Sequence, residues 1–348
     1  MEINTEKRNK GSYWHLPVIF GIVALFAGVW FFSGGWFWKK PVLVESTEIL
    51  MNTTFNVKIF IKDKKSGQRL IKEAFDEARR IEHIMEPVKG DGELKRLNTR
   101  TGNGWIGLSP ELRAVMKQAF VYYERSGGAF DPTIAPVKWL WGFEDGGQVP
   151  GDIELKEKLN LVNLSLIELK SDSLRFKDSG IRLDLGGVAK GFAVDRMLTV
   201  LKRGGATAVL VNAGGDIAMF GKKPGDRDWI IGLRHPRLNR TIIMDTIPFP
   251  SVATSGDYER YFMEDGIRYH HILDPVTGYP ARECISVTAW TTSAMAADIL
   301  ATTIFVMGPG KGLALAENLD NVETLIFFES GGKVMSVMSS GIKGRIRL

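Results

Sequence analysis

The sequence reads Ser293-Ala-Met-Ala-Ala-Asp298-Ile-Leu-Ala-Thr302-Thr-Ile-Phe-Val-Met, an Ala-rich apolar run that predicts a helix over 294–306. Ser293 is a residue type favoured at helix N-caps, and strong helix formers follow it. Asp298 and Thr302 are four positions apart, so both side chains lie on one helix face. A carboxylate and a hydroxyl suit a hard cation such as Mg2+. Asp and Thr are also common near helix starts for electrostatic reasons, so neighbouring motifs must decide between the two interpretations.

A second motif combines a predicted strand, a glycine turn and a helix. It reads Asp184-Leu-Gly-Gly-Val-Ala-Lys190-Gly-Phe-Ala-Val-Asp195. The motif begins at the end of a predicted strand over 181–185, turns at the two glycines and continues into a predicted helix over 188–203. Glycines let a phosphate approach the backbone, the helix N-terminus offers unpaired N–H groups, and Lys190 adds a positive charge. The spacing matches neither a P-loop nor G-x-G-x-x-G, and such a turn more often serves packing.

Further turns of the same kind lie beside apolar strands. Each could be ordinary turn chemistry, because Gly, Asp, Ser and Pro dominate turns. Together they predict a site. They are Gly127-Gly-Ala-Phe-Asp131-Pro-Thr133, Val211-Asn-Ala-Gly214-Gly215-Asp216, Ala253-Thr-Ser255-Gly256-Asp257-Tyr-Glu259, and Tyr269-His-His271-Ile-Leu-Asp274-Pro-Val-Thr-Gly278, the last expected in a hairpin.

Six segments in this order resemble the ApbE family of FAD:protein FMN transferases, over roughly residues 43–348. The segments are G-A-F-D-P-T, D-L-G-G-V-A-K-G-F-A-V-D, N-A-G-G-D-I, A-T-S-G-D-Y-E, H-H-I-L-D-P-V-T-G and A-A-D-I-L-A-T-T-I-F-V-M-G. Any one of them is a weak signal, whereas six in order are very hard to obtain by chance. The resemblance implies an α+β, T-fold-related flavin transferase domain.

The resemblance also implies an activity, namely the Mg2+-dependent transfer of the FMN half of FAD to a Thr or Ser hydroxyl of a partner protein. A phosphoester forms and AMP is released. The family's metal ligands fall on Asp298, Thr302 and the backbone carbonyl of Ala189. A phosphorus-group transfer needs charge neutralisation and a proton acceptor, and the expected catalytic residues are therefore Lys190, Asp298 and His271. His270 and Asp274 are weaker candidates for the proton acceptor.

The FAD-binding residues implied by the resemblance come from every motif. Among them, Asp257 and the nearby Glu259 could contact the adenosine ribose, line the pocket or simply be solvated. The full expected set is Met85, Asp131, Thr133, Asp184, Gly186, Gly187, Lys190, Gly214, Gly215, Asp216, Ser255, Gly256, Asp257 and His271.

The sequence departs from the family at two positions. Val88 stands where the family has a tyrosine that stacks on the isoalloxazine ring, and Val276 replaces the arginine of a D-P-R-T-G motif. The lost stacking is worth ~0.5–1.5 kcal/mol and should weaken FAD binding without abolishing it. Trp139 or Trp141 could substitute for the missing ring.

The N-terminal region predicts a membrane anchor. Residues 16–38 form an uncharged apolar run, and a membrane-spanning helix needs ~20 such residues. We expect a cytoplasmic basic segment at 1–15, an uncleaved signal anchor at 16–38 in the cell inner membrane, and an extracytoplasmic (periplasmic) transferase domain at 39–348. Flanking positive charges are nearly balanced, no A-x-A-like cleavage site follows, and no Cys lies near the run to carry a lipid.

Composition narrows the class of protein further. Cys284 is the sole cysteine, so an internal disulfide is excluded. The net charge of +5 is modest and not clustered, which does not favour nucleic-acid binding. The expected strands neither alternate strictly with the expected helices nor form one block. The strands are expected over 42–50, 56–61, 181–185, 208–211, 229–233, 285–290 and 324–328, and the helices over 65–85, 110–126, 188–203 and 294–306. This pattern indicates an α+β fold.

Two other functions remain open from the sequence. An FAD pyrophosphatase giving FMN and AMP would use the same pocket with water as nucleophile, and a non-catalytic flavin-binding carrier would keep the pocket without turnover. The Asp298 and Thr302 pair argues against the carrier. The expected partners are FAD, membrane lipid and a membrane or extracytoplasmic redox protein. No acceptor-like D/S-G-A-T run occurs in the chain, which argues against self-flavinylation.

Overall fold

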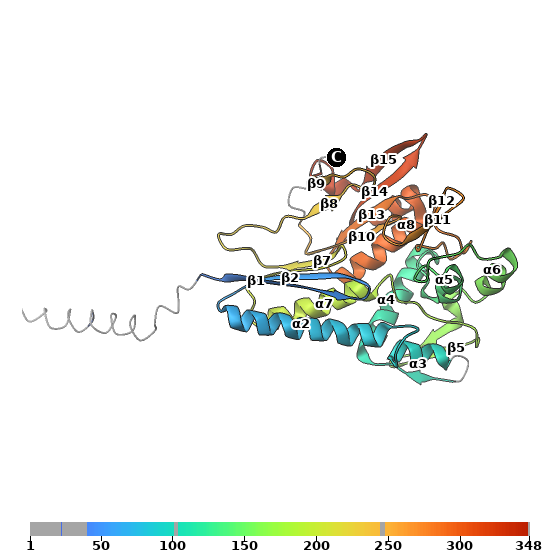
Figure 1. Cartoon of the computed structure of the whole chain (residues 1–348), viewed down its shortest axis with the longest axis horizontal. Coiled ribbons are helices and arrows are strands. Elements are labelled where there is room, and N and C mark those ends of the chain that lie inside the picture. The colour runs from blue at the N-terminus through green and yellow to red at the C-terminus, as the bar shows by residue number, and fades with distance from the viewer. Residues whose placement is uncertain (1–21, 23–39, 101–103, 244–247, 347–348) are drawn as a thin grey trace, which may run out of the picture. The chain divides into compact units, whose positions relative to one another are not determined.

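The computed structural model describes residue 22 and residues 40–100, 104–243 and 248–346. The predicted basic segment at 1–15 lies outside the described residues, as does the predicted anchor at 16–38 except for Ile22. Residues 42–348 form one compact unit, which holds every element discussed below (Figure 1).

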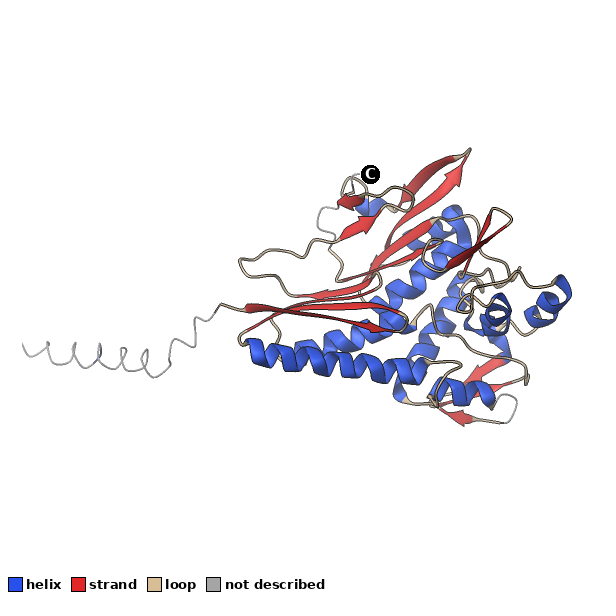
Figure 2. Cartoon of the chain, viewed as in Figure 1, coloured by secondary structure: helices blue, strands red, loops and turns tan. Residues whose placement is uncertain are grey.

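An eight-stranded sheet, antiparallel at every pairing, forms the centre of this unit (Figure 2). Its spatial order is β1-β2-β6-β7-β10-β13-β14-β15. The strands are β1 Val42–Leu50, β2 Thr53–Ile61, β6 Ala208–Ala213, β7 Asp216–Phe220, β10 Ser251–Gly256, β13 Ser286–Thr291, β14 Glu323–Ser330 and β15 Lys333–Met338.

The helices over 64–85, 189–203 and 294–317 cover one face of this sheet, and other helices and small sheets complete the unit (Figure 2). The helices are α2 Lys64–Met85, α3 Glu93–Thr99, α4 Pro110–Ser126, α5 Ala135–Trp141, α6 Asp152–Leu159, α7 Ala189–Arg203 and α8 Ala294–Glu317, with 3₁₀ turns at Pro132–Ile134, Leu164–Leu166 and Ser340–Ile342. The small sheets pair β3 Ile106–Gly107 with β5 Ser173–Phe176 and β4 Ile167–Leu169, β8 Gly232–Arg234 with β9 Thr241–Ile243, and β11 Tyr261–Glu264 with β12 Ile267–His270.

Strand alternation divides the core between the two faces of the sheet. In β10, Ala253 belongs to the large core under α2, α7 and α8, whereas its neighbour Val252 packs on the opposite face with Trp290 and Leu233. Successive side chains of a strand point to opposite faces, which explains this division. Both faces of the central strands are therefore buried.

Helix α8 begins and kinks where its sequence requires. Ser293 Oγ accepts the N–H of Ala296, and the Asp195 carboxylate of α7 accepts the N–H groups of Ala294 and Met295. Gly308 leaves the helical region at φ 78°, directly before Pro309. Among the described residues α8 is the one helix long and apolar enough to span a membrane, but half of its apolar window is buried in the protein core.

The structure corrects two predicted strands. Residues 181–185 pair with no strand, because the side chain of Asn98 bonds both backbone groups of Leu183, at 2.8 and 2.9 Å, and the N–H of Asp184 donates to the carbonyl of Pro132. These contacts replace the ladder that the apolar run predicted. Residues 229–233 were expected to form a strand, but only Gly232–Arg234 does so, paired with β9.

The other expected elements are present. The predicted helices over 65–85, 110–126 and 188–203 match α2, α4 and α7 within one residue, and the helix predicted over 294–306 forms but continues to Glu317. The strands predicted over 42–50, 56–61, 208–211, 285–290 and 324–328 correspond to β1, β2, β6, β13 and β14. The α+β prediction is confirmed.

Candidate active site

A cavity of about 1130 Å3 opens beside the starts of α7 and α8. Its lining comes from segments far apart in sequence: from within residues 51–53, 82–99, 129–145, 182–190, 254–260, 271–275 and 298–306, and from Gly214. A cavity of this size accepts a large organic ligand. The predicted motifs therefore converge on one hollow.

Asp298 of α8 forms polar contacts with the start of α7. Its Oδ2 accepts the backbone N–H of Gly191 at 3.1 Å, and Lys190 Nζ lies 3.3 Å from both carboxylate oxygens. Gly191 is required here, since a Cβ on it would lie 2.3 Å from the Ala294 carbonyl oxygen. The approach of α7 to α8 thus brings a carboxylate and an ammonium group together.

Asp216, at the start of β7, is the second carboxylate of this cluster. Lys190 Nζ lies 2.8 Å from Asp216 Oδ2, so the ammonium group and this buried carboxylate form an ion pair. Burial and the nearby Asp298 raise the pKa of the Asp216 carboxyl. Burial alone would lower the pKa of Lys190, yet the two carboxylates raise it, and the lysine stays charged.

The oxygen-rich surroundings of Asp298 fit a hard cation. Thr302 Oγ1 lies 3.2 Å from Ser255 Oγ, and a Cβ on Gly187 would lie 3.4 Å from the same Thr302 atom. The expected ligands Asp298, Thr302 and Ala189 line the cavity together with Ser255, and carboxylate, hydroxyl and carbonyl oxygens are the donors that Mg2+ prefers. In the described parts of the chain no three His, Cys, Asp or Glu side chains converge as a metal site. Mg2+ commonly uses one or two carboxylates, with substrate phosphates completing its shell.

Lys138 of α5 forms an ion pair inside the cavity with Asp184, at the end of the segment that was predicted as a strand. Lys138 Nζ is 2.9 Å from both Asp184 oxygens, and Asp184 Oδ1 accepts the N–H of Gly186. Although burial opposes it, the Lys138 charge lowers the pKa of Asp184. The pair fixes the start of the glycine turn that leads into α7.

His271 is held through one carbonyl oxygen. The backbone N–H of His271 donates to the carbonyl of Arg260 at 3.1 Å, and its ring Nδ1 lies 3.3 Å from the same oxygen. A carbonyl can only accept, so Nδ1 carries the proton and Nε2 keeps its lone pair. Burial, with the charges of Lys138 and Arg260, lowers the pKa of His271 well below its usual value. The ring is thus a neutral base at pH 7.

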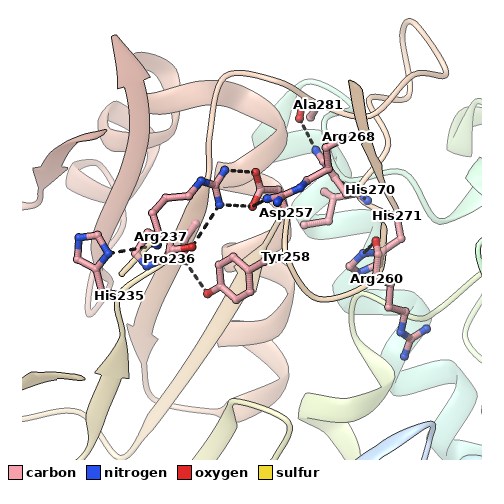
Figure 3. A network of polar contacts seen from close by, with 12 residues as sticks. His235, Pro236, Arg237, Asp257, Tyr258, Arg260, Arg268, His270, His271 and Ala281 are labelled. Carbon is pink, nitrogen blue, oxygen red and sulfur yellow. Dashed lines mark hydrogen bonds and ion pairs between the residues drawn. The ribbon is translucent and has the colours of Figure 1, made fainter. Parts of the chain in front are cut away.

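His270 is instead bonded at both ring nitrogens. Nε2 donates to the Ala281 carbonyl at 2.8 Å (Figure 3). Nδ1 accepts the N–H of Ile272. Burial lowers the pKa of His270 to about 4. Its side chain does not line the cavity, whereas that of His271 does. This geometry favours His271 over His270 as the proton acceptor.

Most residues expected to contact the ligand line the cavity. The four that do not are Thr133, Gly215, Asp216 and Asp257, and of these Asp216 contacts the cavity residue Lys190. The lining residues of the predicted set are Met85, Asp131, Asp184, Gly186, Gly187, Ala189, Lys190, Gly214, Ser255, Gly256, His271, Asp298 and Thr302.

Two of the expected ligand contacts have local structural partners. Asp131 accepts the N–H and hydroxyl of Thr133 and the N–H of Leu164, so it caps a 3₁₀ turn. Asp257 forms ion pairs with Arg237, at 2.8 Å, and with Arg268, at 3.3 Å (Figure 3). These bonds occupy both carboxylates.

Sequence reasoning missed several charged residues of the cavity, and four of them form ion pairs. Lys138 pairs with Asp184, 46 residues away, and Glu144 lies 3.6 Å from Arg260 and 4.0 Å from Lys89. Each belongs to a segment whose local pattern indicates only a helix or a turn. Glu144 follows the Trp141-Gly-Phe143 run, and its opposite-charge partners become neighbours only in the folded chain.

The chain is similar to known proteins of one family. The model of the ApbE family matches residues 51–326. The chain is 32% identical to the FAD:protein FMN transferase of Treponema pallidum, over 86% of this chain and 88% of the relative, and 31% identical to that of Vibrio cholerae, over 84% and 90%.

Solved structures give the same result. The flavin transferase ApbE from Vibrio cholerae aligns with a TM-score of 0.77 at 30% identity, covering 87% of this chain and 99% of that one. The ApbE protein of Thermotoga maritima aligns with a TM-score of 0.78 at 34% identity, covering 88% and 100%. The resemblance seen in the six motifs is confirmed, and the chain belongs to the ApbE family.

Proposed function

We propose that this chain transfers FMN from FAD to a Thr or Ser hydroxyl of a target protein. The observation that carries the proposal is the single cavity that collects the glycine turn, Lys190, Asp298 and His271, in a chain whose relatives are FAD:protein FMN transferases. The chain covers 88% and 90% of two of these relatives, so most of each relative's length has a counterpart here.

The reaction exchanges one phosphorus–oxygen bond for another. The acceptor oxygen bonds to the phosphorus of the FMN half, the bond from that phosphorus to the bridging oxygen breaks, and AMP leaves with that oxygen. The hydroxyl proton moves to His271 Nε2, the ring nitrogen that retains its lone pair. The neutral state of the ring at pH 7 follows from its lowered pKa.

Charge on the diphosphate is neutralised by groups of the cavity wall. Lys190 lies in the cavity wall beside Asp298, and Lys138 lies in the same wall beside Asp184, at the start of the glycine turn. Asp298, Thr302 and the backbone carbonyl of Ala189 would hold Mg2+, with Ser255 beside them. When bound, Mg2+ would stabilise negative charge that develops on the phosphate oxygens.

The proposal extends to the place of the reaction. Residues 16–38 would anchor the chain in the inner membrane, with the catalytic unit on the periplasmic side and the lysines at 39 and 40 near anionic lipid. The support is the length of this apolar run and the basic residues before it. The acceptor would then be a redox protein of the membrane or the periplasm.

The test is an intact-mass measurement on a flavoprotein acceptor incubated with the full-length chain, FAD and Mg2+. We expect the acceptor to gain the mass of one FMN phosphoester and AMP to appear in equal amount. Free FMN with an unmodified acceptor across a panel of redox proteins would instead identify an FAD pyrophosphatase. FAD left intact would contradict both activities and leave a flavin carrier.

A further inference from the structure

Trp139 presents an unpartnered indole ring to the cavity. Trp139 belongs to the short helix α5, is 42% exposed and lines the cavity. In the part of the chain that the structure describes, it has no hydrogen bond, stacked ring or cation–π contact. Leaving so large an apolar surface in water is unfavourable, so a ligand that covers it gains free energy.

The other described tryptophans have partners or are buried. Trp141 is fully buried, donates to the Gly278 carbonyl at 2.8 Å and stacks on Phe143. Trp290 is 2% exposed, and Trp229 packs on an aromatic ring. Trp105, 38% exposed, carries Lys170 Nζ over its ring at 4.0 Å and Arg175 at 5.0 Å. Among the described tryptophans, Trp139 therefore combines an exposed ring without an aromatic or cationic partner with a place in the cavity wall.

The other aromatic rings of the cavity wall offer less surface. Phe130 is 5% exposed and packs in the core, and Phe143 is already stacked on Trp141 with an interplanar angle of 9°. Lys138, the neighbour of Trp139 on α5, places its ammonium group in the same wall. One short helix therefore places a flat aromatic surface and the Lys138–Asp184 ion pair in the same wall, and the aromatic surface suits a ligand with a planar ring.

We propose that Trp139 is a flavin-binding residue whose indole stacks on the isoalloxazine ring of FAD. This inference rests on the proposed transferase function, in which FAD occupies the cavity. Oxidised isoalloxazine is electron-poor and indole is electron-rich, so the two rings favour an offset stack. Trp139 then adds affinity for the FMN half, the part that is transferred, and none for the AMP that leaves.

The test separates the two halves of FAD. The Kd values of FMN and of AMP are measured by calorimetry with Mg2+ on the full-length chain in detergent and on three variants. Trp139→Leu keeps an apolar side chain without the ring, Trp139→Tyr keeps a ring, and Trp105→Leu is the matched control. We expect Trp139→Leu to weaken FMN binding about three- to tenfold. AMP binding should not change, and neither Trp105→Leu nor Trp139→Tyr should shift the FMN Kd by more than about twofold.

A spectroscopic signature distinguishes stacking from a structural effect. FMN bound to the wild-type chain should show quenched fluorescence and a red-shifted visible absorption band, both lost in Trp139→Leu and retained in Trp139→Tyr. Unchanged FMN affinity and spectrum in folded Trp139→Leu would overturn the proposal, as would an equal loss for AMP. Should Trp139→Leu not fold, the tyrosine variant decides: retained quenching supports stacking, and a tenfold loss of FMN affinity refutes it.

These readouts are independent of turnover. If the wild-type chain bound FMN through Trp139 but modified no acceptor, the transferase proposal alone would fail. If the acceptor were modified and Trp139→Leu bound FMN normally, the stacking proposal alone would fail.

Discussion

The backbone carbonyl of Arg260 accepts two hydrogen bonds from His271, one from its amide and one from ring Nδ1. The two residues are eleven positions apart, joined through the β11–β12 hairpin. This arrangement fixes both the position and the tautomer of the imidazole. The side chain of Arg260 lies 3.6 Å from Glu144, and both residues belong to the cavity lining. The hairpin thus holds the proposed base in the wall.

Replacing His271 should remove the proton acceptor without removing the pocket. We expect His271→Ala to bind FAD within about threefold of wild type and to lose ~10²–10⁴ in kcat. Because the pKa of His271 is lowered, the base stays neutral as the pH falls, and wild-type kcat should hold until the pH is well below 6.5. Stopped-flow measurement of AMP release across pH checks both points. Normal turnover of the variant would make His271 a structural residue.

Asp298 should be needed for the metal-dependent rate. Asp298→Ala removes the carboxylate beside Thr302 and leaves Lys190 paired with Asp216 alone, so Mg2+-dependent turnover should fall by at least ~10². Turnover is measured as a function of Mg2+ concentration, with circular dichroism as the test of folding. The exposed Asp320→Ala serves as the control. Undiminished activity of Asp298→Ala would remove the metal assignment.

A ring at position 88 should strengthen flavin binding. Val88 lines the cavity and is 48% exposed, which agrees with the position inferred from the sequence for a stacking residue. We expect Val88→Tyr to lower the Kd of FAD about two- to tenfold. Flavin fluorescence titration measures this change, with Val88→Leu as the control for size. Equal affinities of the two variants would show that the sequence register or the stacking argument is wrong.

Asn98 should contribute strongly to stability. Its buried side chain satisfies both backbone groups of Leu183, which has no strand neighbour. Asn98→Ala would leave a buried donor and acceptor unpaired and should lower the free energy of unfolding by roughly 2–4 kcal/mol. Urea denaturation tests this value. Asn56→Ala removes an exposed side-chain bond to Thr47 and should cost under ~1 kcal/mol.

Asp195 should make stability depend on pH. Burial raises the pKa of its carboxyl to about 6, despite the N–H groups of Ala294 and Met295. A raised carboxyl pKa means that the folded state binds the proton more tightly, so the stabilisation is present in acid and is lost as the pH rises to about 6.

The comparison variant is Asp195→Asn, which does not titrate. The stability of wild type relative to this variant should be greater at pH 4.5 than at pH 7.5, by roughly 1–2 kcal/mol. Urea unfolding at the two pH values measures the difference. An equal or opposite difference would show that the carboxylate is not destabilised by burial.

Local sequence predicted the elements that carry their own signals. Helix α4 begins at the Ser109 cap with Pro110 and ends at Gly127 with φ 61°, and each of these residues marks that position by its own chemistry. The prediction of a strand over 181–185 was wrong because a strand depends on a partner and not on local signals alone. The apolar alternation of this segment is that of a strand, but a strand forms only where a neighbouring strand supplies hydrogen bonds. Here the side chain of Asn98 bonds the backbone N–H and carbonyl of Leu183 instead.

The sequence by itself determined the family, the α+β class, the main helices and the motifs that line the cavity, because these depend on residue types at fixed spacing. The tertiary structure alone decided which charges meet. Lys138 contacts Asp184, Lys190 lies between Asp216 and Asp298, and His271 bonds to the carbonyl of Arg260. Hydrogen bonds and ion pairs require separations of about 3–4 Å, and only chain folding brings residues tens of positions apart to that range.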